Sequence, residues 1–124
     1  METTIIQKYI HTAPRKLRLV ADMVRAMEPE KALESLRFTQ KYAADDLLKA
    51  IQTAMASAKQ KGMEKVMFKS LEINEGPKMK RFRAGTRGRT KPFARKMSHI
   101  KIVLSDEVRI ESVEKPKVKR KEKK

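Results

Sequence analysis

The sequence predicts an α+β fold in which one strand and three helices precede two strands that form a long β-hairpin. Three observations support this prediction. Apolar residues alternate near the amino terminus, recur at helical spacing between residues 14 and 61, and alternate again on either side of a glycine-containing basic segment. With 124 residues, of which 40% are hydrophobic, the chain is long enough for one small domain with a modest core.

The first predicted strand covers residues 4–11, and we expect it to join the sheet at the base of the hairpin. In a regular strand Ile6 and Ile10 lie on one face and Ile5 and Tyr9 on the other, so both faces carry apolar groups. A helix then begins at Pro14, because proline fits the first helical position. Its apolar positions are Leu17, Val20, Ala21, Val24 and Met27.

Two further helices and a strand follow. Pro29 begins a short helix, and residues 41–61 form the strongest helical pattern, with an apolar stripe that includes Leu47, Leu48 and Ile51. Gly62 is placed for a carboxyl-terminal cap of that helix. Residues 65–74 are predicted to form a strand that contains a bulge or twist, because the phase of its apolar alternation changes. We expect three methionines to fill the core, namely Met23, Met27 and Met55.

The segment from residue 76 to residue 105 contains ten Lys or Arg residues and no Asp or Glu, in a chain with a net charge of +16. Its turn-forming residues, Gly85, Gly88 and Pro92, separate two extended runs, so we predict a β-hairpin at about 76–103 with its tip between residues 85 and 92. Both glycines allow positive φ and close backbone approach at this tip. A two-stranded ribbon that repels itself needs an anionic partner to be ordered, and a disordered basic loop is the alternative for the free protein.

We expect a single domain over residues 1–114 and a disordered basic tail over residues 115–124, which contains seven basic residues. The absence of cysteine excludes disulfides and thiolate metal sites, and the sequence implies no metal and no cofactor. No signal-peptide pattern or run of eighteen apolar residues is present, so a soluble, cytoplasmic location is expected.

The sequence contains no recognisable catalytic constellation, and we do not expect an enzyme. His11 and His99 are far apart and lack a nucleophile or carboxylate in a known motif, and no phosphate-binding loop occurs. The cations favour nucleic acid, because neutralising phosphates releases condensed counterions, while Phe82 and Phe93 can stack on unpaired bases. Charge alone does not separate RNA from DNA, so an architectural DNA-binding protein stays open, as does a cationic membrane-surface protein.

Two groups of motifs lie in the helical and hairpin segments. The first is Pro-Arg-Lys-Leu-Arg-Leu-Val at 14–20; the second comprises Glu-Gly-Pro at 75–77, Lys-Arg-Phe-Arg at 80–83, Arg-Gly-Arg at 87–89, Arg-Lys at 95–96 and Ser-His-Ile at 98–100. Together they resemble the motifs of the bacterial large-subunit ribosomal protein L-twenty-two (universal uL-twenty-two) family. The resemblance covers about residues 4–106. It departs from the family at the tip, where Arg-Ala-Gly-Thr at 83–86 replaces the usual Arg-Pro-Arg-Ala, and at Pro92.

The resemblance implies a two-layer domain with the hairpin as its extension. It implies binding to 23S rRNA early in large-subunit assembly and contact with neighbouring ribosomal proteins. The hairpin would line the nascent-peptide exit tunnel and meet the nascent polypeptide there. No membrane or small-molecule substrate is implied.

The residues that the resemblance assigns to rRNA binding are Arg15, Lys16, Arg18, Lys78, Lys80, Arg81, Arg83, Arg87, Arg89, Lys91, Arg95, Lys96, Ser98 and His99. Those that it places at the tunnel are Ala84, Gly85, Thr86, Arg87, Gly88, Arg89 and Thr90. For the three basic residues between 15 and 18, an ordinary solvated helix face is the alternative.

Overall fold

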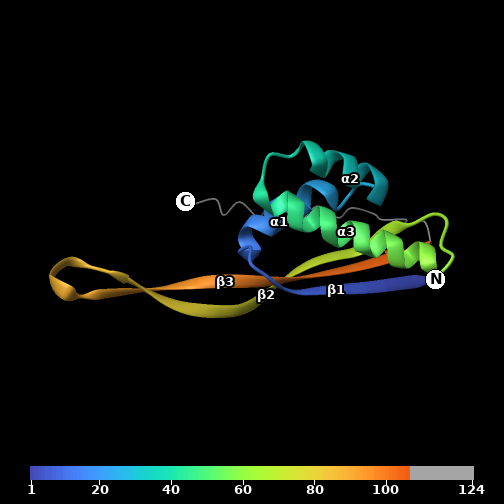
Figure 1. The fold of residues 1–124 in the computed structure, drawn as a ribbon. Helices are drawn as coiled ribbons and strands as arrows, with labels where there is room; N and C mark the ends of the chain where they lie inside the picture. Colours follow the sequence, from blue (N-terminus) through green and yellow to red (C-terminus); the bar gives the residue numbers. More distant parts are fainter. Residues whose placement is uncertain (107–124) are drawn as a thin grey trace, which may run out of the picture.

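In the computed structural model, which describes residues 1–106, three helices cover one face of a three-stranded sheet (Figure 1). The elements, in chain order, are β1 (Glu2–Ile10), α1 (Pro14–Val24), α2 (Pro29–Phe38), α3 (Tyr42–Gln60), β2 (Met67–Ala84), the short 3-10 helix η1 (Thr86–Gly88) and β3 (Thr90–Ser105). The predicted two-layer α+β class is confirmed. The predicted tail at 115–124 and the last residues of the predicted domain lie outside the described residues.

The sheet is antiparallel throughout, with β3 between β1 and β2. The first strand pairs with the domain end of β3, from Glu2 opposite Ser105 to Ile10 opposite Ser98, as expected for a strand at the hairpin base. The hairpin arms are much longer than β1, so β2 and β3 continue past it as a two-stranded ribbon (Figure 1).

The helices begin and end close to the predicted residues. α1 and α2 each have proline at the start, where its missing amide proton costs no intrahelical hydrogen bond. α3 ends in the predicted cap, because Gly62 has a φ of 76° and the Met63 amide donates to the Ala58 carbonyl at 3.1 Å.

The core lies between the helices and the domain end of the sheet. Fully buried side chains of α1 and α3, among them Leu17 and Ile51, form one cluster with Ile100, Ile102 and Leu104 of β3. Leu48 and Met55 pack only partly against this cluster. The core prediction is wrong for two methionines: Met23 and Met27 are 48% and 40% exposed, since α1 ends at Val24 and Met23 lies off its buried face.

A bulge in β1 corrects the predicted faces of that strand. Pairing with β3 shifts between Gln7 and Ile10, and Tyr9 within this interval has a φ of 59°. The extra residue returns Ile10 to the core face that Ile5 occupies, while Ile6 faces solvent. Grouping Ile6 with Ile10 was therefore wrong.

Two bulges shape β2. The first, between Phe68 and Ser70, confirms the predicted change of phase. The second places Gly76 and Pro77 opposite Met97, one residue from the last pairing of β1. A side chain on Gly76 would place its Cβ 2.9 Å from the Met97 carbonyl carbon, so only glycine fits without a shift. This bulge marks the point where the domain ends and the free ribbon begins.

Candidate nucleic-acid interface

Residues 78–96, which we call the distal ribbon, extend away from the helices with no third strand beside them among residues 1–106, and only Arg95 and Lys96 at the base lie near the starts of α1 and α3 (Figure 1). Their register runs without a break from Lys78 opposite Lys96 to Ala84 opposite Thr90. The chain reverses between Gly85 and Arg89, so the tip is shorter than predicted. Every side chain of the distal ribbon is at least partly exposed.

Pro92 belongs to a strand and not to the turn, which corrects the prediction for the tip. It lies opposite Phe82 in β2. The Gly85 amide donates to the Arg89 carbonyl at 2.6 Å, and hydrogen-bonded pairs alternate with non-bonded pairs in an antiparallel ladder. By this alternation the pair of Phe82 and Pro92 is a non-bonded one, where proline removes no ladder hydrogen bond.

The two tip glycines are needed for different reasons. Gly88 has a φ of 71° in open space, which favours glycine for its conformation alone. Gly85 has a φ of −117°, but a Cβ there would lie 2.6 Å from the Arg89 carbonyl oxygen, so the need is for space. Arg87 also has a positive φ of 54°, without being glycine. The tip is thus a tight turn with two neighbouring left-handed residues.

The register divides the distal ribbon into two unlike faces, because side chains alternate along each strand. One face carries cations with two apolar side chains among them, and its members are Met79, Arg81, Arg83, Lys91, Phe93 and Arg95. The other has lysines near the domain and small or apolar side chains toward the tip, and its members are Lys78, Lys80, Phe82, Ala84, Thr90, Pro92, Ala94 and Lys96. We call them the arginine face and the mixed face.

Each face presents one aromatic ring. On the arginine face the Arg83 guanidinium carbon lies 4.7 Å from the centroid of the Phe93 ring, a cation–π contact that holds a flat cationic surface in place. On the mixed face Phe82 is 70% exposed. Both arrangements leave planar groups free to stack on unpaired bases.

Most cations of the distal ribbon lack counter-charges among residues 1–106. Of the ten cations between residues 76 and 105, two form ion pairs among residues 1–106. Lys78 pairs with Glu75 at 3.6 Å and Lys101 pairs with Glu72 at 3.5 Å, both toward the domain end of the hairpin. Eight cations from Lys80 to Lys96 have no carboxylate partner in the described part of the chain. An anionic ligand would relieve their mutual repulsion.

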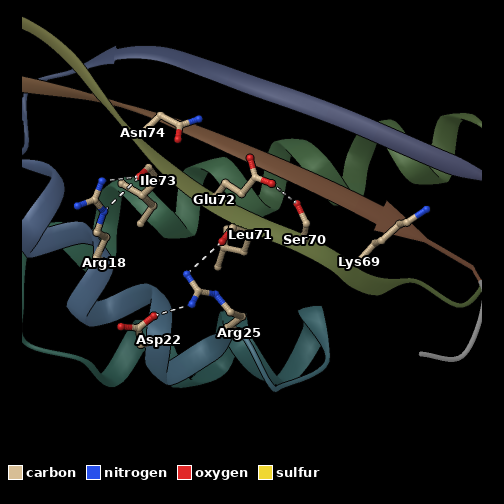
Figure 2. Close-up of a pocket in the computed structure, with 9 residues that line it drawn as sticks. All are labelled: Arg18, Asp22, Arg25, Lys69, Ser70, Leu71, Glu72, Ile73 and Asn74. Atoms are coloured by element: carbon tan, nitrogen blue, oxygen red, sulfur yellow. Dashed lines mark hydrogen bonds and ion pairs between the residues drawn. The ribbon is translucent and has the colours of Figure 1, made fainter. Parts of the chain in front are cut away.

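The three cations in the first turns of α1 that are predicted to contact rRNA have different surroundings. Arg15 and Lys16 are exposed. Arg18 instead donates from Nε and Nη2 to the Ile73 carbonyl at 3.3 and 3.1 Å (Figure 2). Arg25 likewise donates to the Leu71 carbonyl at 3.2 Å and pairs with Asp22 (Figure 2). Both arginines cover the outer edge of β2, and this limits pairing of that edge with another strand. Arg18 therefore has a role inside the protein that its sequence pattern did not indicate.

Ser98 and His99, which the resemblance assigns to rRNA binding, also have internal partners. Ser98 is fully buried, and its hydroxyl donates to the Thr12 carbonyl at 2.8 Å. The His99 Nδ1 accepts the Tyr9 amide at 3.0 Å, and the two rings meet edge to face with centroids 5.2 Å apart. These residues join the β1–α1 connection to β3. A polar motif on a strand gave no signal of which side it would face.

Metal sites and membrane-spanning helices can be assessed for the described residues. No group of three or more His, Cys, Asp or Glu side chains comes together among residues 1–106. Within that range no helix combines the length and hydropathy that crossing a bilayer requires. Outside the distal ribbon, a hydrogen bond from Lys31 to Glu28 raises the pKa of Lys31, and a hydrogen bond from the α-amino group lowers the pKa of Asp106.

Comparison with known proteins places this geometry in a family. Residues 5–105 match the family model described as "Ribosomal protein L22p/L17e". The "Large ribosomal subunit protein uL22" of Syntrophotalea carbinolica is 36% identical over 109 residues, which cover 86% of this chain and 99% of the relative.

Two further relatives carry the same description. That of Desulfotalea psychrophila is 38% identical over 109 residues, and that of Mycoplasma capricolum is 40% identical over 110 residues; in both cases 86% of this chain and 99% of the relative are covered. The matched region contains all three helices, the larger part of β1 and the whole hairpin. The chain therefore belongs to the L22p/L17e family of large-subunit ribosomal proteins.

Proposed function

We propose that this protein binds 23S rRNA during assembly of the large ribosomal subunit, and that the distal ribbon makes most of the contact. The observation that carries the proposal is the set of eight cations, on a ribbon that has no core, without carboxylate partners in the part of the chain that the structure describes. Such a surface gains most from an array of phosphates, since each neutralised phosphate releases condensed counterions. Its role is structural, in the cytoplasm, beside other proteins of the same subunit.

RNA is favoured over DNA by the aromatic groups as well as by family membership. Phe93 is already held against Arg83, and Phe82 projects from the opposite face, so both faces offer planar surfaces to bases. Sequence-specific RNA contacts favour unpaired and splayed bases, whereas a duplex keeps its bases stacked inside. The contacts that we propose involve Lys78, Lys80, Arg81, Arg83, Arg87, Arg89, Lys91, Arg95 and Lys96, with Arg15 and Lys16 on α1.

We further infer that the tip lines the exit tunnel and meets the nascent polypeptide. From Lys78 to Arg87 an extended strand reaches about 30 Å at roughly 3.3 Å per residue, which allows a tip inside the RNA with the domain outside. The tip combines small groups with two cations, and it consists of Ala84, Gly85, Thr86, Arg87, Gly88, Arg89 and Thr90. Small side chains would leave room for a peptide to pass along the tunnel wall, while Arg87 and Arg89 can reach phosphates of the rRNA.

Subunits reconstituted with the parent or a variant chain test both parts. We expect the parent chain to co-sediment with the large subunit through a high-salt wash. In the charge-reversal pair Arg87→Glu and Arg89→Glu, chemical footprints of the rRNA around the tunnel should change and assembly should slow. The matched control is the pair Arg37→Glu and Lys49→Glu, which reverses two exposed cations on α2 and α3. Identical footprints and assembly rates for all three chains would refute the tip assignment.

A further inference from the structure

Three surface pockets differ sharply in charge. The pocket between α1 and the edge of β2 mixes Arg18, Arg25 and Lys69 with Asp22 and Glu72 (Figure 2). The pocket near the end of β3 has two lysines among four carboxylates. The third has four cations and no carboxylate in its lining, with a volume of about 650 Å³. We call it the junction pocket, and its cations are Lys16, Lys41, Arg95 and Lys96.

The junction pocket forms where the domain meets the ribbon. Its walls come from the β1–α1 connection, the first turns of α1 and α3, and the part of β3 at the base of the distal ribbon. Neither Ala13 before α1 nor Lys41 before α3 places a side-chain cap on the first helical amides. The partial positive charge of two helix starts therefore adds to that of the lysines and Arg95.

One wall of the pocket is held by two side-chain hydrogen bonds, one partly buried and one buried. The Thr12 hydroxyl donates to Asp46 Oδ2 at 2.5 Å, and the Ser98 hydroxyl donates to the Thr12 carbonyl at 2.8 Å. Asp46 is thus bonded to Thr12, and it does not belong to the pocket lining. These bonds tie α3 and β3 to the β1–α1 connection. The pocket therefore needs little rearrangement to accept a ligand.

Tyr42 and Leu19 add apolar surface to this cationic site. They line the pocket and remain 75% and 58% exposed, although large apolar groups gain from burial. A cationic pocket with an exposed aromatic ring matches two parts of a nucleotide, the phosphate and the flat base. The volume lies within the range of about 300 to 1,000 Å³ that is common for small-ligand sites.

We infer that the junction pocket receives one unpaired nucleotide of the rRNA, with its phosphate near Lys16 and Lys41 and its base stacked on Tyr42. The inference rests on the proposed rRNA binding and extends it to a site of the domain. Arg95 belongs both to the arginine face and to the pocket, so the same RNA strand can continue from one to the other. The nucleotide is unpaired, because a base inside a duplex is not free to stack on a tyrosine.

The test measures binding of the full-length chain to 23S rRNA over a range of salt concentrations. Tyr42→Ala should weaken binding by about 5- to 150-fold with an unchanged salt slope, because a stacked base is lost and no charge changes. Tyr42→Phe should retain most of the affinity. Lys41→Ala should reduce the salt slope by about 1, as expected for one lost phosphate contact.

Matched controls are Phe38→Ala and Lys49→Ala, which remove an exposed aromatic ring and an exposed lysine outside the pocket. Both should bind like the parent, and all variants should keep the parent's thermal midpoint. If the parent binds with a steep salt slope but Tyr42→Ala and Lys41→Ala match their controls, the inference is overturned and the proposed function stands. The inference is also overturned if Tyr42→Ala and Lys41→Ala bind rRNA normally yet fail to enter subunits. That result would indicate that a protein segment occupies the pocket. A parent that does not bind rRNA would refute the proposed function itself.

Discussion

The helix-covered domain and the distal ribbon differ in what holds them in shape. In the domain, Leu17, Ile51 and Leu104 are fully buried, and the arginines near the sheet edge are hydrogen-bonded to backbone carbonyls. In the ribbon, backbone pairing and one cation–π contact hold two strands, and the cations from Lys80 to Lys96 have no carboxylate partner among residues 1–106. Stability and ligand affinity are therefore expected to respond to different substitutions.

The largest loss of stability is expected from Ile51→Ala. This side chain is fully buried on α3, so truncation should lower the free energy of unfolding by about 2 to 5 kcal/mol through lost burial and a cavity. Leu48→Ala, on a half-buried neighbour, should cost less, about 1 to 2 kcal/mol. Chemical denaturation of both variants measures the difference. Equal losses, or none, would contradict the assigned face of α3.

A smaller loss is expected at the joint between the two regions. Gly76→Ala forces a Cβ against the Met97 backbone, which should cost about 1 to 3 kcal/mol as overpacking does. The control is Gly62→Ala, where no atom lies within 4 Å of the new Cβ and only the positive φ is strained. Thermal unfolding compares the two. A Gly76 variant as stable as the parent would show that the joint is loose.

The edge of β2 should show a weaker effect. Arg18→Ala removes two hydrogen bonds to the Ile73 carbonyl on a partly exposed edge, and the expected loss is about 1 kcal/mol. Arg15→Ala, on the exposed side of the same helix, is the control for lost charge and should leave the unfolding curve unchanged. If the Arg15 variant were the less stable one, the internal role of Arg18 would be wrong.

The smallest effect on stability is expected at the tip. Gly88→Val strains a left-handed residue, but that residue lies outside the core and its Cβ meets no neighbouring atom. The melting midpoint of the domain and its circular dichroism should stay close to those of the parent, while subunit assembly slows. A clear fall in the midpoint would mean that the ribbon and the domain unfold as one cooperative unit.

Much of the fold could be predicted from the sequence, and the failures have local causes. Helical spacing predicted α3 to within one residue at each end, and the change of phase near Phe68 predicted its bulge. The faces of β1 were wrong, because alternation says nothing of Tyr9 entering the left-handed region. Pro92 was taken as a turn residue, since its place in a non-bonded pair depends on a register that only the folded hairpin sets.

The candidate site was predictable where it depended on composition alone. Ten cations without an acid over residues 76–105 indicated the ribbon. The partners of Ser98 and Arg18 were not predictable, because they lie 86 and 55 residues away along the chain. The junction pocket was not predictable for the same reason, because Lys41 and Tyr42 meet Arg95 only once α3 packs beside the base of the ribbon.

The central claim is that the distal ribbon carries the affinity and the domain carries the stability. Its most direct test replaces residues 80–94 by Asn-Gly, which joins the paired residues Met79 and Arg95 by a two-residue turn and removes six cations. The salt dependence of 23S rRNA binding is then compared with that of the parent. We predict a slope shallower by about 4 to 5 if all six cations contact phosphates, with an unchanged thermal midpoint. An unchanged slope, or an unfolded domain, would contradict the claim.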